Sequence, residues 1–177
     1  MRPRALAALL ALLPCCASRT PTPVTETRTA PPPPRAPALP LEDEPVGVLP
    51  EGVTPTRYAL TLDVDPAAGT FRGEVDIAVR LDARRDAVWL HGQGLTVTAA
   101  EVRRPNGPAI AARWTPGARD GVAALRFGAP VGPGAVTLHL AFEAPLNRQL
   151  EGLYRAESGG DAYAFTQFEA LSARRAF

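Results

Sequence analysis

The sequence has few of the residues that usually carry chemistry in an enzyme site. Its 177 residues include two cysteines, two histidines and no lysine. The histidines, His91 and His139, do not form a His-Glu-x-x-His motif, and neither a Gly-x-Ser-x-Gly motif nor a glycine-rich phosphate loop occurs. Residue types and spacing alone therefore identify no catalyst and no metal site.

An excess of charge of one sign and a long apolar run are missing as well. The 19 basic residues, all arginine, and the 18 acidic residues are interspersed and leave a net charge of +1. No basic stripe is available for phosphate backbones, so nucleic acid is not an expected partner. The apolar run at residues 5–13 is far shorter than the roughly 20 residues that a transmembrane helix requires.

The first 17 residues are typical of a secretory signal. Arg2 and Arg4 precede the apolar residues 5–13, and the small residue Ala17 follows them. Both cysteines lie at the end of the apolar run, which favours a lipoprotein signal in which Cys15 or Cys16 is lipidated. Ordinary cleavage after Ala17 is the alternative. We therefore expect export to a bacterial cell envelope or periplasm, lipid-anchored or secreted, with a membrane contact only through the lipid.

Residues 18–49 are rich in proline and threonine and include a run of four prolines. Such a segment has too few apolar side chains to offset the entropy of ordering, so we expect a disordered, extended linker. The part that follows contains no cysteine, and its stability must come from a hydrophobic core rather than from disulfides.

Residues 50–177 predict an all-β domain, an antiparallel β-sandwich or saddle-like sheet. Apolar and polar residues alternate along short segments that glycine- and proline-rich turns separate. The first two segments predict a hairpin with one buried face, which includes Tyr58 and Leu60. The predicted strands are 58–64, 71–81, 87–91, 95–102, 110–114, 122–127, 136–142, 152–155 and 162–169, and residues 170–175 are the first that favour a helix.

One pair of polar residues has a distinctive arrangement. Gln167 and Glu169 are two positions apart on a predicted strand, and so they are expected to project from the same face. A carboxylate beside an amide suits an ammonium group, such as the α-amine of a peptide. From spacing alone, the simpler interpretation is that Gln167 and Glu169 are two exposed polar residues on an end strand. The same alternation predicts that His139 is a surface or hydrogen-bonded strand histidine.

Several short motifs occur in order along the chain: Leu49-Pro50, Val53-Thr54-Pro55-Thr56-Arg57-Tyr58, Phe71-Arg72-Gly73, Leu90-His91, Gly152-Leu153-Tyr154-Arg155, Thr166-Gln167-Phe168-Glu169-Ala170 and Ser172-Ala173-Arg174-Arg175-Ala176-Phe177. Together they resemble the zinc aminopeptidases of the aminopeptidase N and leukotriene A4 hydrolase type. The resemblance implies that the folded part of this chain corresponds to the N-terminal β-domain of that family, which covers the metal-bearing catalytic domain. It also implies that Gln167 lines the pocket for the first side chain of the substrate and that Glu169 binds its α-amine.

The family continues beyond the position of Phe177 with a Pro-Cys-x-Asp-Glu-Pro segment. Its GxMEN substrate motif, HExxH zinc ligands and general base, third glutamate ligand and oxyanion-stabilising tyrosine come later still. Ser172 stands where the family commonly has aspartate. We therefore expect this chain to be inactive alone, with zinc in the missing catalytic domain and with peptide N-termini and that domain as its partners. An exposed apolar patch and poor solubility are also expected.

The resemblance favours the N-terminal substrate-recognition domain of an exported zinc aminopeptidase. The alternative is a stand-alone, non-catalytic envelope lipoprotein that uses the same β-domain as a binding module. An unrelated sandwich that matches by accident is a third interpretation. The predicted organisation is a signal at 1–17, a linker at 18–49 and a C-terminally incomplete β-domain at 50–177.

Overall fold

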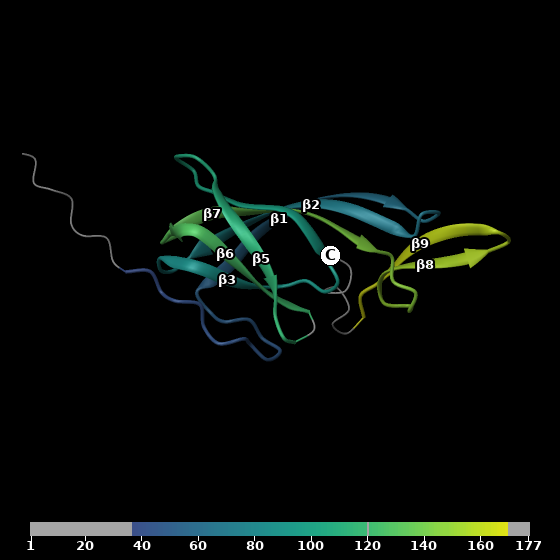
Figure 1. The fold of residues 1–177 in the computed structure, drawn as a ribbon, viewed down its shortest axis with the longest axis horizontal. Helices are drawn as coiled ribbons and strands as arrows, with labels where there is room; N and C mark the ends of the chain where they lie inside the picture. Colours follow the sequence, from purple (N-terminus) through teal and green to yellow (C-terminus); the bar gives the residue numbers. More distant parts are fainter. Residues whose placement is uncertain (1–36, 120, 170–177) are drawn as a thin grey trace, which may run out of the picture. The chain divides into compact units, whose positions relative to one another are not determined.

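A computed structural model describes residues 37–119 and 121–169 of the chain. These residues form nine antiparallel strands and no helix (Figure 1). Each strand overlaps one predicted from the alternating pattern, so the all-β fold class is confirmed. The strands are β1 (Val53–Asp65), β2 (Thr70–Leu81), β3 (Arg85–His91), β4 (Thr96–Arg103), β5 (Ile110–Pro116), β6 (Val122–Val131), β7 (Gly134–Pro145), β8 (Gly152–Ser158) and β9 (Asp161–Gln167).

Seven strands form one curled sheet in the order β1-β2-β7-β4-β5-β6-β3, and β8 and β9 form a separate hairpin (Figure 1). Strand β5 makes the curl, because its first residues pair with β4 and its later residues pair with β6. The result is a half-barrel whose inner face carries the core. Strands β1 and β3 are its two edges.

The core follows from the alternation along β7 and β2. On β7, Val136, Leu138, Leu140, Phe142 and Ala144 are buried, and the residues between them face outward. Strand β2 has the same period, because successive side chains of a strand point to opposite faces. The other large buried side chains come from β3, β4 and β6 and include Val88, Leu90, Val102, Leu125 and Phe127.

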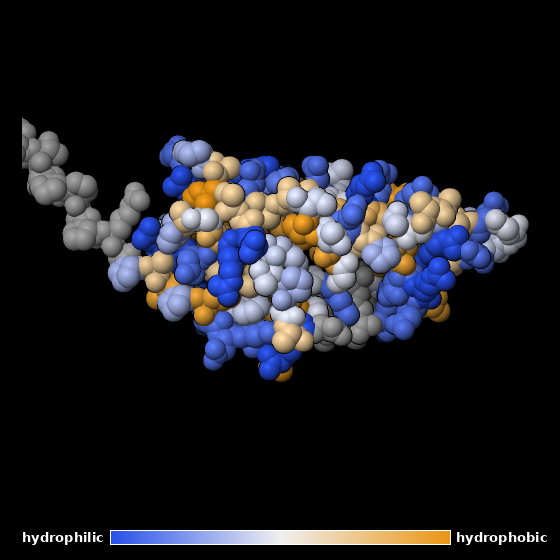
Figure 2. All heavy atoms as spheres, viewed as in Figure 1, coloured by the Kyte–Doolittle hydropathy of each residue, from blue (hydrophilic) through white to orange (hydrophobic). Residues whose placement is uncertain are grey.

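The first strand differs from the prediction of a hairpin with one buried face. Tyr58 is 62% exposed and Leu60 is 37% exposed, although both belong to the apolar side of β1. On β1, only Val53 at its start and Leu62 and Val64 near the β1–β2 turn are partly buried and pack against the core. The reason is topological, since β1 pairs only with β2 and lies at the open edge of the half-barrel. Apolar side chains reach the surface among polar ones (Figure 2).

The glycine of the Phe71-Arg72-Gly73 motif has a packing role. Gly73 lies opposite Phe142 of β7 and Leu62 of β1 in the sheet register. A Cβ atom at residue 73 would lie 2.5 Å from Phe142 Cζ and 2.9 Å from Leu62 Cδ2. The Phe142 ring in turn contacts Phe71 edge to face, with 6.3 Å between ring centroids. Only glycine leaves room for this aromatic pair.

The ordered contacts of the domain begin before residue 50, the boundary that the sequence predicts. Leu39 donates its backbone N–H to the carbonyl of Arg84, and Glu42 pairs with Arg85. Residues 37–49 therefore differ from the expected disordered linker, because long-range partners hold part of this segment against the sheet.

Several sequence predictions lie outside the described residues. They concern the signal at residues 1–17, with Cys15 or Cys16 as the lipidation site, residues 18–36 of the linker and the helix-favouring residues 170–175. Among the residues that the structure describes, none forms a helix that could cross a membrane.

Candidate functional site

The hairpin of β8 and β9 carries the predicted site at the end of its second strand. The two strands pair from Gly152 with Gln167 to Ser158 with Asp161. Gly159 and Gly160 form the turn, and both have positive φ angles, which favour glycine. Every residue of β9 therefore has a defined partner on β8.

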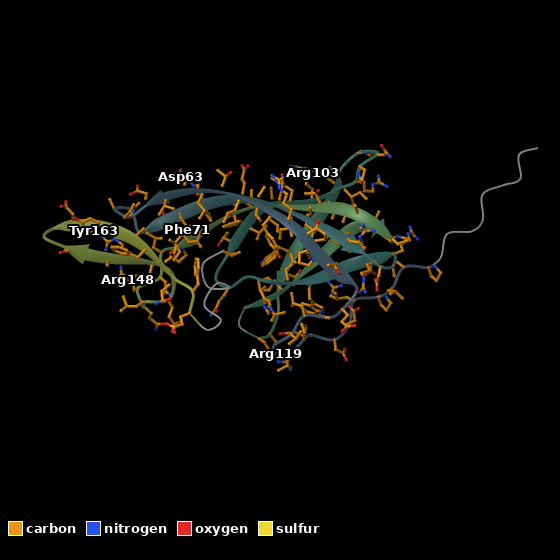
Figure 3. All side chains as sticks on the ribbon, turned by 180° about the vertical axis from the view of Figure 1, so that it is seen from behind. Asp63, Phe71, Arg103, Arg119, Arg148 and Tyr163 are labelled. Carbon is orange, nitrogen blue, oxygen red and sulfur yellow. The ribbon has the colours of Figure 1, made fainter. Side chains whose placement is uncertain are left out.

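Aromatic side chains cover one face of this hairpin. The rings of Tyr154 and Phe165 stack with centroids 5.8 Å apart, and Tyr163 packs against Phe165 at 6.4 Å. Tyr163 and Phe165 nevertheless remain 45% and 49% exposed, and Tyr163 lies on the arm of the hairpin (Figure 3). An exposed aromatic surface of this kind is typical of a contact with another protein surface or a ligand.

The structure ends β9 at Gln167, so the predicted strand is two residues too long. Glu169 lies just after the strand, and its backbone N–H donates to Gln167 Oε1 at 3.0 Å. The two residues do meet, but through a side-chain-to-backbone turn rather than through a shared strand face. Both side chains are exposed. Their roles toward a substrate remain predictions.

This turn has a chemical consequence for Gln167. One acceptor position of its amide oxygen is used by Glu169 N–H, and its amide NH₂ can donate to a ligand. The carboxylate of Glu169 can accept from an ammonium group. The pair therefore offers one donor and one anion at the end of a strand.

Asn147, in the β7–β8 connection, fixes the base of the hairpin. Its backbone N–H donates to Leu153 O at 2.9 Å, and its carbonyl accepts from Arg155 N at 2.8 Å. Its side-chain oxygen accepts from Gln149 N at 2.9 Å, and its side-chain nitrogen donates to Glu151 O at 3.1 Å. One asparagine thus orders the loop and the start of β8.

Arg155 ties the same hairpin to the large sheet. Its Nε donates to the carbonyl of Pro66 in the β1–β2 turn at 2.6 Å. Its guanidinium also pairs with Glu157, two residues along β8. The motif Gly152-Leu153-Tyr154-Arg155 therefore begins strand β8 and also connects the hairpin to the β1–β2 turn through Arg155.

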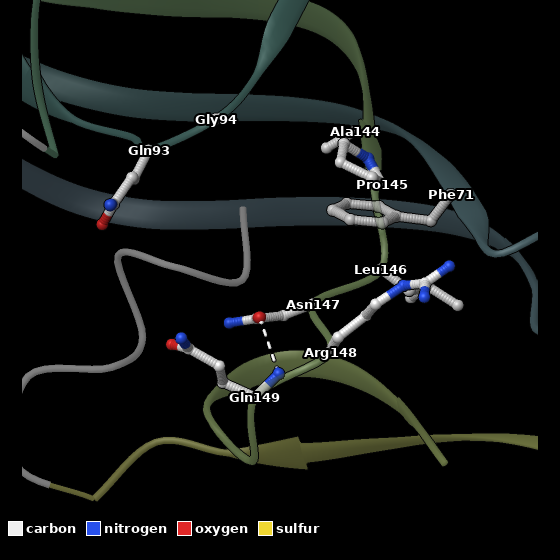
Figure 4. A pocket seen from close by; sticks show the side chains of 9 residues that line it. All are labelled: Phe71, Gln93, Gly94, Ala144, Pro145, Leu146, Asn147, Arg148 and Gln149. Atoms are coloured by element: carbon white, nitrogen blue, oxygen red, sulfur yellow. Dashed lines mark hydrogen bonds between the residues drawn. The ribbon is translucent and has the colours of Figure 1, made fainter. Parts of the chain in front are cut away.

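A cleft of about 520 Å³ lies where the β7–β8 connection faces the β3–β4 connection (Figure 4). Its polar side chains are amides and one guanidinium, which can donate to the carbonyl or carboxylate oxygens of a ligand. Sequence reasoning missed this cleft, because its two walls are about fifty residues apart in the chain and form no motif. Its lining residues are Phe71, Gln93, Gly94, Ala144, Pro145, Leu146, Asn147, Arg148 and Gln149.

The histidines lie apart from this hairpin. His139 Nδ1 lies 2.7 Å from Asp76 Oδ1 on the outer face of the sheet, which confirms the predicted hydrogen-bonded strand histidine. His91 Nδ1 lies 3.0 Å from Gly121 O. Within residues 37–119 and 121–169, no three histidine, cysteine, aspartate or glutamate side chains are grouped so that they could hold a metal ion.

An ion-pair cluster surrounds His139. Arg103 on β4 contacts Asp76 at 3.1 Å and Glu101 at 2.7 Å. The hydrogen bond that Arg103 donates to Glu101 raises the pKa of Arg103, and the nearby Asp76 adds to this effect. The groups are partly exposed and each is paired with another, so they form a solvated surface network.

Comparison with known proteins connects this domain to one family. The family model described as the peptidase M1 N-terminal domain matches residues 54–177. Aminopeptidase M1-D of Oryza sativa subsp. japonica is 34% identical over 134 residues, and aminopeptidase M1 of Arabidopsis thaliana is 34% identical over 137 residues. The alanine/arginine aminopeptidase of Saccharomyces cerevisiae is 32% identical over 139 residues.

These matches cover 73% of this chain but only 15% or 16% of each relative. The chain therefore spans about one sixth of the length of the curated relatives it matches. The matched family region begins at residue 54 and includes all nine strands except the first residue of β1, together with Gln167 and Glu169.

Proposed function

Because the chain belongs to the family of the peptidase M1 N-terminal domain, we propose that it is the substrate-recognition β-domain of an exported, zinc-dependent aminopeptidase. The observation that carries this proposal is the family match over residues 54–177, which includes the end of β9. The aminopeptidase names of the relatives supply the reaction class: removal of residues from the amino end of a peptide.

In this proposal, Glu169 binds the α-amine of the substrate and Gln167 lines the pocket for its first side chain. The chemistry of the pair supports these roles, since a carboxylate and an amide donor lie next to each other at an exposed strand end. Hydrogen bonds between charged partners are about twice as strong as neutral ones, so a single carboxylate can select a protonated amine.

In a zinc-dependent peptidase, the metal ion activates water and polarises the scissile carbonyl. The described residues do not offer a set of zinc ligands, and we assign no step of hydrolysis to them. In the proposed enzyme, zinc and the catalytic groups belong to a further domain, and this β-domain contributes binding and orientation.

The exposed apolar side chains are consistent with the proposal that a second domain packs against this one. Tyr58 and Leu60 lie on the open edge of the half-barrel, and Tyr163 and Phe165 lie on the hairpin. Exposed apolar patches of this kind mark sites where another protein surface binds. The proposed cover is the catalytic domain of the same protein.

The coding sequence after the Phe177 codon tests the proposed function. We expect a continuation that encodes a Pro-Cys-x-Asp-Glu-Pro segment and the GxMEN and HExxH motifs. The purified continuous protein should hydrolyse an aminoacyl-nitroanilide, lose this activity with a zinc chelator and regain it when zinc is added. A genuine intergenic region after that codon would contradict the proposal and favour the stand-alone binding module.

A further inference from the structure

Residues 39–44 make a set of contacts that the family match does not include, since that match begins at residue 54. The contacts occur at three points and reach two separate parts of the sheet. At the first point, Leu39 N–H donates to Arg84 O at 2.6 Å, and Leu39 forms a parallel bridge with Arg85. This bridge lies at β3, an edge strand of the large sheet.

The second point is a charge pair at a buried arginine. Arg85 is only 4% exposed, and its Nη1 donates to Glu42 Oε1 at 2.6 Å. Its Nη2 donates to Asp82 Oδ1 and to the carbonyl of Glu51, both at 3.2 Å. Burial lowers the pKa of Arg85, but the hydrogen bonds that Arg85 donates to Glu42 and Asp82 outweigh this effect, and the pKa is raised. The backbone of Glu42 also accepts a bond from Trp89 Nε1 at 2.9 Å.

The third point is the turn between β5 and β6. Glu44 accepts hydrogen bonds from the backbone N–H groups of Ala118 at 2.9 Å and Arg119 at 2.6 Å. The Arg119 guanidinium donates to the carbonyl of Glu44 at 3.1 Å. Successive backbone N–H groups that converge in this way form an anion-binding concavity. Arg119 lies at this turn, away from the β8–β9 hairpin (Figure 3).

Two glycines make room for these carboxylates and their partners. A Cβ atom on Gly117 would lie 2.8 Å from Glu44 Oε1, and a Cβ atom on Gly52 would collide with the guanidinium of Arg85 and the carboxylate of Asp82. The sheet therefore has a shaped site for this segment, with a buried cation, an indole donor and an anion-binding turn.

We propose that residues 39–44 form a strap that occupies an acidic-peptide site made by Arg85, Trp89 and the 117–119 turn. The strap covers the edge of β3. An edge strand exposes unpaired backbone groups that attract a further strand, and a covering segment prevents this. The proposal is independent of the peptidase function, because it uses no residue of the β8–β9 hairpin.

Hydrogen exchange of the full chain tests the strap. A Glu44→Gln variant should increase the exchange rates of the Ala118 and Arg119 amides by about tenfold, because both amides lose a charged acceptor. The matched control is Asp43→Asn, which removes the same charge from an exposed neighbour. In this control both amides should keep the wild-type rate, and the amides of β2 serve as a fold control in both variants.

Equal rates at Ala118 and Arg119 in the two variants would overturn the proposal, whether both stay slow or both become fast. A Glu42→Gln variant provides a second readout at the other end of the strap. It should accelerate exchange of the Leu39 amide and leave β2 unchanged; an unaltered Leu39 rate would also contradict the strap.

The strap should weaken at acidic pH. The backbone hydrogen bond from Ala118, followed by that from Arg119, lowers the pKa of Glu44 from its ordinary value of 4.5. A lowered pKa means that the contact is fully present above pH 4.5 and is lost as the pH falls through the folded-state pKa. The charged group that faces Glu44 is Arg119, with Nη1 3.9 Å from Glu44 Oε1. Glu42 and Asp43 precede Glu44 in the chain, and His91 contacts the same turn through Gly121 O. After correction for intrinsic rates, protection of Ala118 and Arg119 should fall below pH 4.5 in the wild type and should stay low and flat in Glu44→Gln.

Discussion

A Gly73→Val variant is expected to lose about 3 kcal/mol of unfolding free energy, the upper end of the usual cost of overpacking a core. The new Cβ would lie 2.5 Å from Phe142 Cζ, and the ring cannot retreat freely because Phe71 packs against it edge to face. Strand β2 is paired on both sides, so the backbone also has little freedom to move away. Denaturant unfolding followed by circular dichroism would measure the loss.

The matched control is Ala59→Val, which adds the same β-branched side chain to the exposed outer face of the neighbouring strand. This control should change stability by less than about 0.5 kcal/mol, as is usual for surface substitutions. Shortening the opposing ring with Phe142→Leu should recover part of the loss in the double variant. A Gly73→Val protein as stable as the control, with no coupling to residue 142, would contradict the packing account of the Phe-Arg-Gly motif.

A Glu169→Gln variant is expected to bind peptides with a free α-amine about 10- to 100-fold more weakly than the wild type. The estimate takes about 1.5–3 kcal/mol for a hydrogen bond between charged partners, and 1.4 kcal/mol corresponds to a factor of ten. The substitution keeps the shape of the side chain and removes its charge. It should leave the fold intact, since Glu169 is exposed and lies beyond the end of β9. Calorimetric titration of the full chain would measure the change.

Asp161→Asn is the control for that substitution. Asp161 is also an exposed carboxylate, but it lies at the opposite end of β9 beside the turn. Its replacement should leave peptide affinity within about twofold of the wild type, since a distant exposed charge is screened by solvent and salt. If both variants bind equally well, the α-amine is not recognised by Glu169.

The strands were predictable because alternation and turn residues are local signals. Nine segments with period two correspond to nine strands, and most disagreements concern one to four residues at their ends. The exposure of Tyr58 could not be predicted from the alternating pattern. Its apolar character correctly assigns it to the inner side of β1, but burial depends on which strand lies opposite, and the open edge of the half-barrel leaves that side uncovered.

The end of β9 illustrates a different limit. Period two predicts that the strand continues to Glu169, but Gln167 Oε1 accepts the Glu169 N–H and replaces the ladder with a turn. Side-chain bonds to the local backbone compete with regular structure in this way. The sequence identified the two residues, and the structure changed the geometry that relates them.

The strap was missed because its partners are distant in the chain. The prolines and acidic residues before residue 50 have the composition of a disordered linker. Glu42 nevertheless meets Arg85, 43 residues later, and Glu44 meets Ala118, 74 residues later. The residues near Glu42 and Glu44 in the sequence do not indicate that a buried guanidinium and a distant turn will bind these carboxylates.

The central claim is that the end of β9 recognises the amino end of a peptide, and the most direct measurement compares two ligands on the full chain. One ligand is a short peptide with a free α-amine, and the other is the same peptide with that amine acetylated. The account predicts that the free peptide binds more tightly and shifts the amide resonances of Gln167 and Glu169, whereas the acetylated peptide does neither. Equal binding of the two peptides, or shifts confined to other strands, would contradict it.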